Sequence, residues 1–274
     1  MSAAIAVQGP ISASRPSSAR PCINSRCDTG YDQGSGVGAI GIPRALRYYS
    51  ASQRLFRAVL AQRGKALMDL DAAGREDLRV LLETRGLVPL LMHDVAALHI
   101  QSCVRAARQL GGAMAEAGVF MGGSARLICA AKGDVPLHLF DVFETLQIPP
   151  GAPSGEREAG LRGHFGQLHG CRDQVERLLS PYAAVHLHPG VFPASAEALK
   201  GEWFSFVHLD MDLVRSTTDA LDFFHPRLVQ GGILIGDDYQ DPGVHRAFAD
   251  FFADRGESLI GLPWGQVMVV KQEV

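Results

Sequence analysis

The second half of the chain alternates short apolar runs with stretches whose apolar residues recur every three or four positions. The runs are typical of buried strands, because each is short and is bounded by turn-forming or acidic residues. They lie at residues 113–119, 136–140, 183–187, 204–209 and 233–235. The intervening patterns predict helices at residues 125–131, 171–179 and 194–199, after Asp212, and after Tyr239. This alternation predicts an α/β fold with an open, mostly parallel sheet.

Two further apolar runs close the chain. Residues 258–262 and 267–270 predict strands joined by a glycine-containing turn. An antiparallel hairpin of this kind is compatible with the edge of a parallel sheet. Earlier in the chain, Gly231 and Gly232 predict a turn into the run 233–235.

The region before the sheet has a helical pattern. Apolar residues recur at helical spacing through residues 51–110, with a predicted break between Gly64 and Gly74. Residues 90–110 predict one helix with Leu91 and Leu110 on its buried side. Packing against the sheet is the simplest role for these helices, and a lid or a dimer surface are the alternatives.

Residues 1–43 differ in composition from the rest of the chain. They are rich in alanine, serine, proline and glycine, and Asp28 is the first acidic residue. This balance resembles a transit peptide, but a disordered tail, or a start codon assigned too early, is the simpler interpretation. We therefore predict a disordered tail at 1–43, a helical region at 44–110 and the sheet domain at 111–274.

The composition is typical of a soluble globular protein with a sizeable core. The 274 residues are 47% hydrophobic and 20% charged, with a formal net charge of -3. No lysine- and arginine-rich run points to a nucleic-acid partner, and no apolar stretch approaches the roughly 20 residues that span a bilayer. Five scattered cysteines without a C-x-x-C motif indicate free thiols in a reducing compartment, so we expect a cytoplasmic protein.

Aspartates follow two of the predicted strands. Asp210 and Asp212 come after the run 204–209, and Asp237 and Asp238 come after the next predicted strand. Carboxyl ends of parallel strands share one edge of the sheet, where ligands bind, so these four side chains should lie together. Four carboxylates repel one another unless a cation joins them, and Mg²⁺ and Ca²⁺ prefer oxygen ligands. Helix caps and turns are the competing roles for any one of these aspartates.

A glycine loop and an acidic residue indicate a second binding element. Gly122, Gly123 and Ser124 lie between the first predicted strand and its helix, where glycines allow a sharp turn and a close approach to a ligand. Their spacing does not match the dinucleotide fingerprint G-x-G-x-x-G. Asp141 ends the next strand about 20 residues later, where an acidic side chain holds a ribose diol in nucleotide-binding sheets. Together they predict a nucleoside cradle, and an ordinary tight turn and a helix N-cap are the alternatives.

Residues 145–170 are polar and glycine-rich. A loop of this length in a compact domain is often a binding lid, so we predict a mobile loop over the ligand edge of the sheet. His164 and His169 lie in this loop, where exposed histidines usually have no specific role.

Five segments of the chain, in this order, resemble the macrocin O-methyltransferase family. They are AEAGVFMGGSAR, LHLFDVFETL, VHLHPGVFP, FVHLDMDLVRSTTDALDFFHPRLVQGGILIGDDY and DPGVHRAFADFF, and the resemblance extends over about residues 85–271. It implies a class I methyltransferase fold, a Rossmann-like sheet of seven strands that is mostly parallel, here with an N-terminal helical extension. It also implies S-adenosylmethionine and Mg²⁺ as cofactors, and a sugar hydroxyl of a macrolide, an aminocoumarin or a related natural product as methyl acceptor.

The resemblance also implies roles for individual residues. The methyl-donor pocket would be lined by Glu116, Gly118, Gly122, Gly123 and Ser124, and the ribose hydroxyls would be bound by Asp141. Mg²⁺ would be held by Asp210, Asp237 and Asp238, and the general base would be Asp212.

Three positions depart from the family pattern. Ala117 stands where family members usually carry cysteine, Met121 where arginine or glutamine often precedes the glycine pair, and Val214 where tyrosine is frequent. None of these changes removes an implied metal ligand. We expect Val214 to alter the wall of the acceptor pocket.

We therefore expect an O-methyltransferase that uses S-adenosylmethionine and Mg²⁺ and acts on a small natural product, with a glycosyl group as the acceptor. A homo-oligomer is the expected assembly. A catechol O-methyltransferase is the alternative with the same metal chemistry. Metal-dependent hydrolysis would leave the glycine loop and Asp141 without a purpose, and a non-catalytic nucleotide-binding module would not need four carboxylates at the ligand edge.

Overall fold

The computed structural model describes residues 50–63, 68–143 and 171–273, so the predicted tail at 1–43 and the predicted lid at 145–170 lie outside the described residues. The chain divides into two compact units, Met1–Leu67 and Met68–Val274. In the first unit, helix α1 (Ala51–Ala61) begins at a capping box. The side chains of Ser50 and Gln53 each accept a hydrogen bond from the backbone N–H of the other residue.

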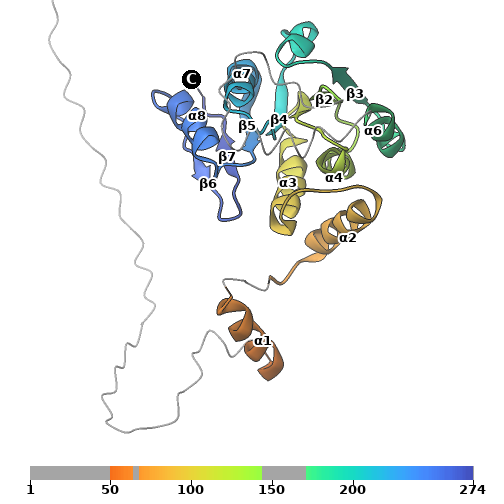
Figure 1. Ribbon diagram of the computed structural model, residues 1–274, viewed down its shortest axis with the longest axis vertical. Coiled ribbons are helices and arrows are strands. Elements are labelled where there is room, and N and C mark those ends of the chain that lie inside the picture. Colours follow the sequence, from red (N-terminus) through yellow and green to blue (C-terminus); the bar gives the residue numbers. More distant parts are fainter. Residues whose placement is uncertain (1–49, 64–67, 144–170, 274) are drawn as a thin grey trace, which may run out of the picture. The chain divides into compact units, whose positions relative to one another are not determined.

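The second unit is built on a seven-stranded sheet (Figure 1). Its strands are β1 (Ala113–Ala117), β2 (Leu137–Asp141), β3 (Val185–Pro189), β4 (Phe204–Leu209), β5 (Leu228–Gly236), β6 (Ile260–Gly261) and β7 (Val267–Val270). Their order is β3-β2-β1-β4-β5-β7-β6. Strands β1 to β5 pair in parallel, whereas β7 pairs antiparallel with β5 and β6, which confirms the predicted α/β class and edge hairpin. The strand order reverses between β1 and β4, which is where open sheets of this kind bind ligands.

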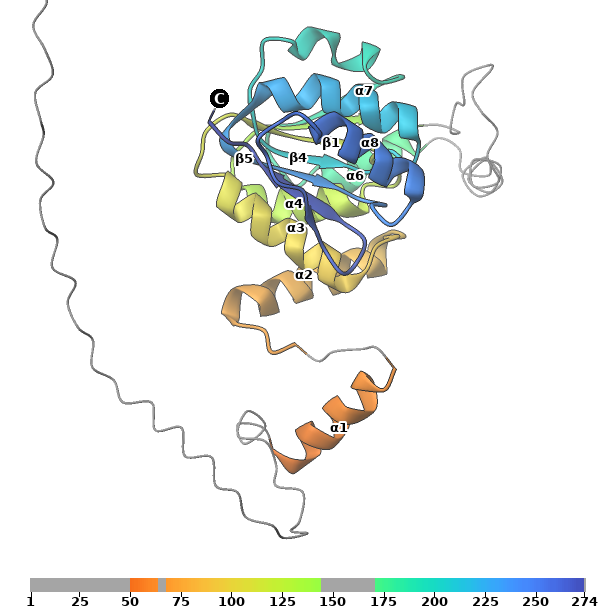
Figure 2. The ribbon, with the colours of Figure 1, turned by 90° about the vertical axis from the view of Figure 1, so that its left-hand side faces the viewer.

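Helices cover both faces of the sheet. Figure 2 shows α7 (Val214–Phe224) and α8 (Pro242–Phe252) on one face, and α3 (Asp94–Ala107) and α4 (Gly123–Lys132) on the other. Helix α2 (Ala72–Leu87) packs on α3 and α4, and α6 (Arg172–Leu179) packs on α4. Two short 3-10 helices are η2 (Ala194–Leu199) and η3 (His225–Arg227). The two buried layers alternate along each strand, so Val207 of β4 packs with α7 and α8, whereas Phe206 packs with α3 and α4.

The helices before β1 differ in detail from the prediction. Helix α3 begins at Asp94 rather than at Leu90, and the expected buried residues Leu91 and Leu110 are 63% and 43% exposed because they lie outside it. Gly74 lies in the first turn of α2, where its N–H donates to the Asp71 side chain at 2.7 Å. Pro89 accounts for the end of α2 at Leu87, because proline disfavours helix in the residue before it, Val88, which is extended.

A partly buried ion pair joins α2 to α3. The guanidinium of Arg105 donates two hydrogen bonds to the carboxylate of Asp77, at 2.5 and 2.6 Å. Both helices belong to the same compact unit as the sheet. Whether this helical region also serves as a lid or a dimer surface stays a prediction.

The turn predicted at Gly231 and Gly232 is instead an irregularity inside β5. Phe204 of β4 pairs with Leu228, and Phe206 pairs with Ile233, so β5 advances five positions while β4 advances two. Gly231 has a φ of 74°, and a Cβ on Gly232 would lie 2.7 Å from the carbonyl oxygen of Val229. Glycine is therefore needed to accommodate the bulge within the strand.

No helix within the described ranges is both long enough and apolar enough to cross a membrane.

Cys103, Cys129 and Cys171 carry free thiols. Burial raises the pKa of Cys103 to about 11 and that of Cys129 to about 12, so neither is a reactive thiolate at neutral pH.

Candidate functional site

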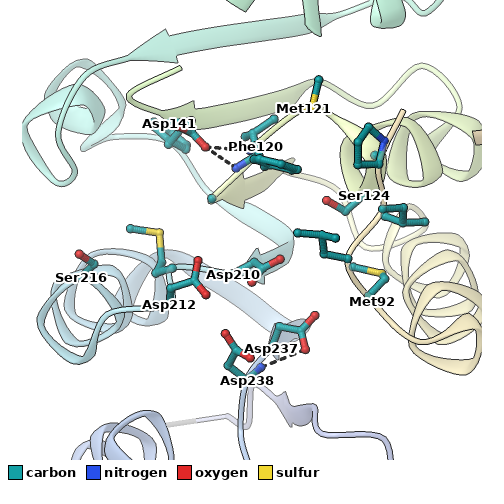
Figure 3. A pocket seen from close by; sticks show the side chains of 18 of the residues that line it. Met92, Phe120, Met121, Ser124, Asp141, Asp210, Asp212, Ser216, Asp237 and Asp238 are labelled. Atoms are coloured by element: carbon teal, nitrogen blue, oxygen red, sulfur yellow. Dashed lines mark hydrogen bonds between the residues drawn. The ribbon is translucent and has the colours of Figure 1, made fainter. Parts of the chain in front are cut away.

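A cavity of about 570 Å³ lies at the carboxyl ends of β1, β2, β4 and β5 (Figure 3). The loop after β1, Asp141 after β2 and the aspartates after β4 and β5 all line it. Residues 89–93 before α3, Val191 and Phe192 after β3, and Trp264 between β6 and β7 line it as well. A cavity of this volume, with apolar walls and a few converging polar groups, is typical of a small-molecule site.

The four aspartates meet at one edge of this cavity, as predicted (Figure 3). A carboxylate oxygen from each of Asp210, Asp212 and Asp238 lies within 4.8 Å of the other two. The φ angles of Asp212 and Asp238 are 58° and 56°, so the backbone leaves the extended conformation at both residues.

Burial and mutual repulsion set the electrostatics of this cluster. The pKa of Asp210 is raised well above its usual range by burial first, and then by the charges of Asp237, Asp212, Asp238 and Glu116. Burial also raises the pKa of Asp237, although the nearby His208 acts against this shift. With an effective dielectric constant of about 20, two like unit charges about 4 Å apart repel each other by roughly 4 kcal/mol.

The donor set of the cluster fits a divalent cation. Carboxylate oxygens are the ligands that Mg²⁺ prefers, and a positive ion would relieve the repulsion that raises the pKa of Asp210. The carboxylates that lie together are those of Asp210, Asp212 and Asp238, and a second group joins Asp210 to Asp237 and His208. The expected ligand set of Asp210, Asp237 and Asp238 stays a prediction.

The glycine loop owes its composition to packing inside the protein. Gly118 has a φ of 89°, and a Cβ there would lie 1.8 Å from the carbonyl oxygen of Asp210. A Cβ on Gly122 would lie 3.2 Å from Leu178, and one on Gly123 would lie 2.9 Å from Leu90. Gly118 therefore lets the end of β1 approach the end of β4. Gly122 lets the start of α4 approach α6, and Gly123 lets it approach the segment before α3. The prediction explained them by close approach to a ligand, and the structure adds this packing role.

Asp141 holds the glycine loop as well as lining the cavity. Its Oδ2 accepts hydrogen bonds from the backbone N–H groups of Val119 and Phe120, at 2.7 and 2.8 Å (Figure 3). Its Oδ1 accepts one from Phe143 at 2.9 Å. Each carboxylate oxygen has two lone pairs, so Oδ1 retains the capacity to accept a hydrogen bond from a ligand hydroxyl. Asp141 lies across the cavity from Asp237 and Asp238 (Figure 3).

Two residues expected to line the methyl-donor pocket are placed elsewhere. Gly118, Gly123 and Ser124 line the cavity, but Glu116 and Gly122 are not among the described residues that do. Glu116 is fully buried, because the alternation of β1 points it into the layer below α3 and α4. There it accepts a hydrogen bond on Oε1 from Nδ1 of His208, at 2.8 Å.

Several cavity residues were not identified from the sequence. Met92, His93, Gln240 and Trp264 line the cavity. Val214 does not line it, and Leu213 and Ser216 line it near that position. His208 does not line the cavity, but one of its ring nitrogens lies within 4.8 Å of carboxylate oxygens of Asp210 and Asp237. The sequence did not single it out because it lies within the apolar run of β4, where a histidine is usually a hydrogen-bonded core residue. Near Trp264, only Gly261 and Gly265 were informative in the sequence, and these predicted the turn between β6 and β7.

Comparison with known proteins identifies the family. Residues 91–262 match the family model described as macrocin-O-methyltransferase (TylF). A curated Streptomyces olivaceus protein is 31% identical over 179 residues, which are 60% of this chain and 69% of that protein. It is named 8-demethyl-8-(2,3-dimethoxy-alpha-L-rhamnosyl)-tetracenomycin-C 4'-O-methyltransferase.

Solved structures agree on the fold. The O-methyltransferase NovP is 24% identical with a TM-score of 0.55, over 64% of this chain and 78% of that one. The calicheamicin methyltransferase CalS11 is 18% identical with a TM-score of 0.56, over 86% of this chain and 99% of that one. The class I methyltransferase fold predicted from the sequence is thus confirmed. The chain belongs to the macrocin-O-methyltransferase family and is an S-adenosylmethionine-dependent O-methyltransferase.

Proposed function

We propose that the protein methylates a sugar hydroxyl of a glycosylated natural product and that it needs Mg²⁺ to do so. The observation that carries this proposal is that the aspartates after β4 and β5 share one cavity with the glycine loop and Asp141. One cavity thus offers a place for a nucleoside and a place for a cation-bound acceptor. The curated relative, which is named for a methylation on a rhamnosyl tetracenomycin, supports a sugar as the acceptor.

The residues of the cavity would bind the methyl donor, hold the cation and accept the proton of the acceptor. Asp141 accepts hydrogen bonds from the ribose hydroxyls of the methyl donor, and Gly118, Gly123 and Ser124 form the wall beside it. Asp210, Asp237 and Asp238 hold the cation, which when bound lowers the pKa of the acceptor hydroxyl. Asp212 faces the same space and accepts the proton of that hydroxyl.

The methyl transfer balances without a further reactant. The acceptor oxygen forms a bond to the methyl carbon as the bond from that carbon to the sulfonium sulfur breaks. The hydroxyl proton goes to the carboxylate of Asp212, and S-adenosylhomocysteine leaves. Because the methyl donor is already activated, the residues contribute chiefly by aligning the two reactants in line.

An acceptor panel tests the substrate class. The purified full chain is incubated with S-adenosylmethionine, Mg²⁺ and matched pairs of glycosylated polyketides and their aglycones, together with simple catechols. We expect mass spectrometry to find one added methyl group, located on the sugar fragment and absent from the aglycones. Methylation confined to catechols or aglycones would refute the sugar assignment.

A further inference from the structure

Two buried polar side chains face each other beneath the aspartate cluster. Glu116 of β1 and His208 of β4 are register partners, and both side chains are 0% exposed. Nδ1 of His208 lies 2.8 Å from Oε1 of Glu116. The next residue on this face of β4 is Asp210, because side chains alternate along a strand.

The other ring nitrogen of His208 points to a ligand. Nε2 is buried and has no hydrogen-bond partner among the described residues. A ring nitrogen of His208 and a carboxylate oxygen from each of Asp210 and Asp237 lie within 4.8 Å of one another. Since Nδ1 is engaged by Glu116, Nε2 is the nitrogen that remains for this group. Buried polar atoms rarely lack a hydrogen-bond partner or a metal ion, so we expect Nε2 of His208 to bind a ligand.

We propose that His208 is a nitrogen ligand of the cation bound by Asp210 and Asp237, with Glu116 orienting its ring. This inference rests on the proposed function in that the cluster binds a cation. A histidine that binds a metal through one nitrogen commonly donates its other N–H to a carboxylate, which fixes the tautomer and the ring orientation. The pair Glu116–His208 has this arrangement.

The proposal has a consequence for metal preference. Mg²⁺ binds to oxygen ligands, whereas imidazole suits first-row transition metals. A site with Asp210, Asp237 and His208 would therefore accept Mg²⁺ through its oxygens and bind Mn²⁺ more tightly through the added nitrogen. A site made of Asp210, Asp212 and Asp238 alone would offer oxygens only.

Pulsed electron paramagnetic resonance of bound Mn²⁺ tests the nitrogen directly. The full chain without a polyhistidine tag is stripped of metal and loaded with one equivalent of Mn²⁺, in ordinary and ¹⁵N-histidine-labelled forms. We expect ¹⁴N modulation from a directly bound imidazole, replaced by a ¹⁵N signal in the labelled protein. Bound Mn²⁺ without this coupling would overturn the nitrogen ligand and leave the carboxylate site of the proposed function intact.

Two variants assign the signal to one histidine. His208→Leu should lose the nitrogen coupling, whereas His186→Leu, at an exposed position on β3, should keep it. Loss of the coupling in His186→Leu and its persistence in His208→Leu would contradict the proposal. If His208→Leu does not fold, the labelled wild-type protein still tests the proposal. Absence of histidine nitrogen coupling in that protein would overturn His208 as a ligand.

Calorimetry separates this inference from the proposed function. Glu116→Gln should weaken Mn²⁺ binding by about tenfold to hundredfold, as is usual for a residue that orients a metal ligand. Unchanged Mn²⁺ affinity in this variant would contradict the orienting role of Glu116. Failure of the wild-type protein to bind either Mn²⁺ or Mg²⁺ would refute the cation site as a whole.

Discussion

Asp212 owes its position to a backbone conformation that few side chains adopt. Its φ is 58°, in the left-handed region, where aspartate and asparagine are better tolerated than other residues with a Cβ. In this conformation its carboxylate lies within 4.8 Å of the carboxylates of Asp210 and Asp238. The backbone thus places the proposed base.

Asp212→Asn should lower kcat by roughly a hundredfold to ten-thousandfold, because asparagine keeps the backbone turn but cannot accept the hydroxyl proton. The affinity for S-adenosylhomocysteine should not change. Steady-state kinetics and calorimetric titration check the two parts. Asp222→Asn, at an exposed position on α7, removes the same charge and should leave kcat as it is. A kcat for Asp212→Asn near that of the wild type would rule out Asp212 as the base.

Residue positions were predictable where strand ends fix them. Asp141, Asp210, Asp237 and Asp238 all line the cavity because each lies at the carboxyl end of a parallel strand. Glu116 lies one step before the end of β1, so its side chain points into the core, and its expected role at the methyl-donor pocket stays a prediction. Its contact with His208 joins residues 92 positions apart, and no local pattern reports such a pairing.

At the scale of elements, Gly118 sets how closely the end of β1 approaches that of β4. Its N–H donates to the carbonyl of Phe140 at 2.9 Å, and the N–H of Asp210 donates to the carbonyl of Ala117 at 2.8 Å. A side chain at Gly118 would lie between these two strand ends. The same glycine therefore supports both the sheet and the position of Asp210.

Gly118→Ala should reduce the free energy of unfolding by at least about 3 kcal/mol, since the overlap with backbone cannot relax easily. The matched control is Gly111→Ala, at a φ of 76° with open space around it. There only the backbone strain should count, at about 1–2 kcal/mol. Urea unfolding measures both variants, and equal losses would show that packing against Asp210 contributes nothing.

The pairing of β2 with β3 contains a histidine that resists protonation. Burial, followed by the neighbours His188 and His186, lowers the pKa of His138 to about 4. Nδ1 of His138 and Nε2 of His188 lie 2.9 Å apart. Between the folded pKa of about 4 and an unfolded value of about 6.5, the unfolded chain binds more protons. The contribution of His138 to stability is therefore present above this window and is lost as the pH falls through it.

His138→Phe should flatten this pH dependence, because phenylalanine keeps an aromatic ring against its neighbours and cannot be protonated. Denaturant unfolding at a series of pH values between about 7 and 4 compares the variant with the wild type. We expect the wild-type free energy of unfolding to fall more steeply with acidification. Parallel curves would show that His138 does not contribute to the acid sensitivity.

Elements were predictable from period and length, but their ends and irregularities depended on distant contacts. The strands, the edge hairpin and most helices follow from runs and spacings that a single segment contains. The bulge in β5 depends on its pairing with β4, so Gly231 and Gly232 appeared to form a turn. The turn with Trp264 reaches the cavity only because β7 pairs with β5, which no local signal indicates.

For the whole molecule, the strand order brings together residues from four segments of the chain. The reversal between β1 and β4 places the glycine loop and Asp141 on one side of the cavity and the aspartate cluster on the other. Burial, and then the charges of the neighbouring aspartates, raise the pKa of Asp210, as expected where carboxylates converge on one site. The proposed mechanism requires a divalent cation held by these aspartates.

The most direct test is the rate of methyl transfer before and after removal of the cation. The purified full chain is treated with a chelator, assayed with S-adenosylmethionine and an accepted glycoside, and assayed again after Mg²⁺ is added back. We expect the rate to be lost in the chelator and to return with Mg²⁺, while S-adenosylhomocysteine binds throughout. An unchanged rate in excess chelator would contradict the requirement for a cation.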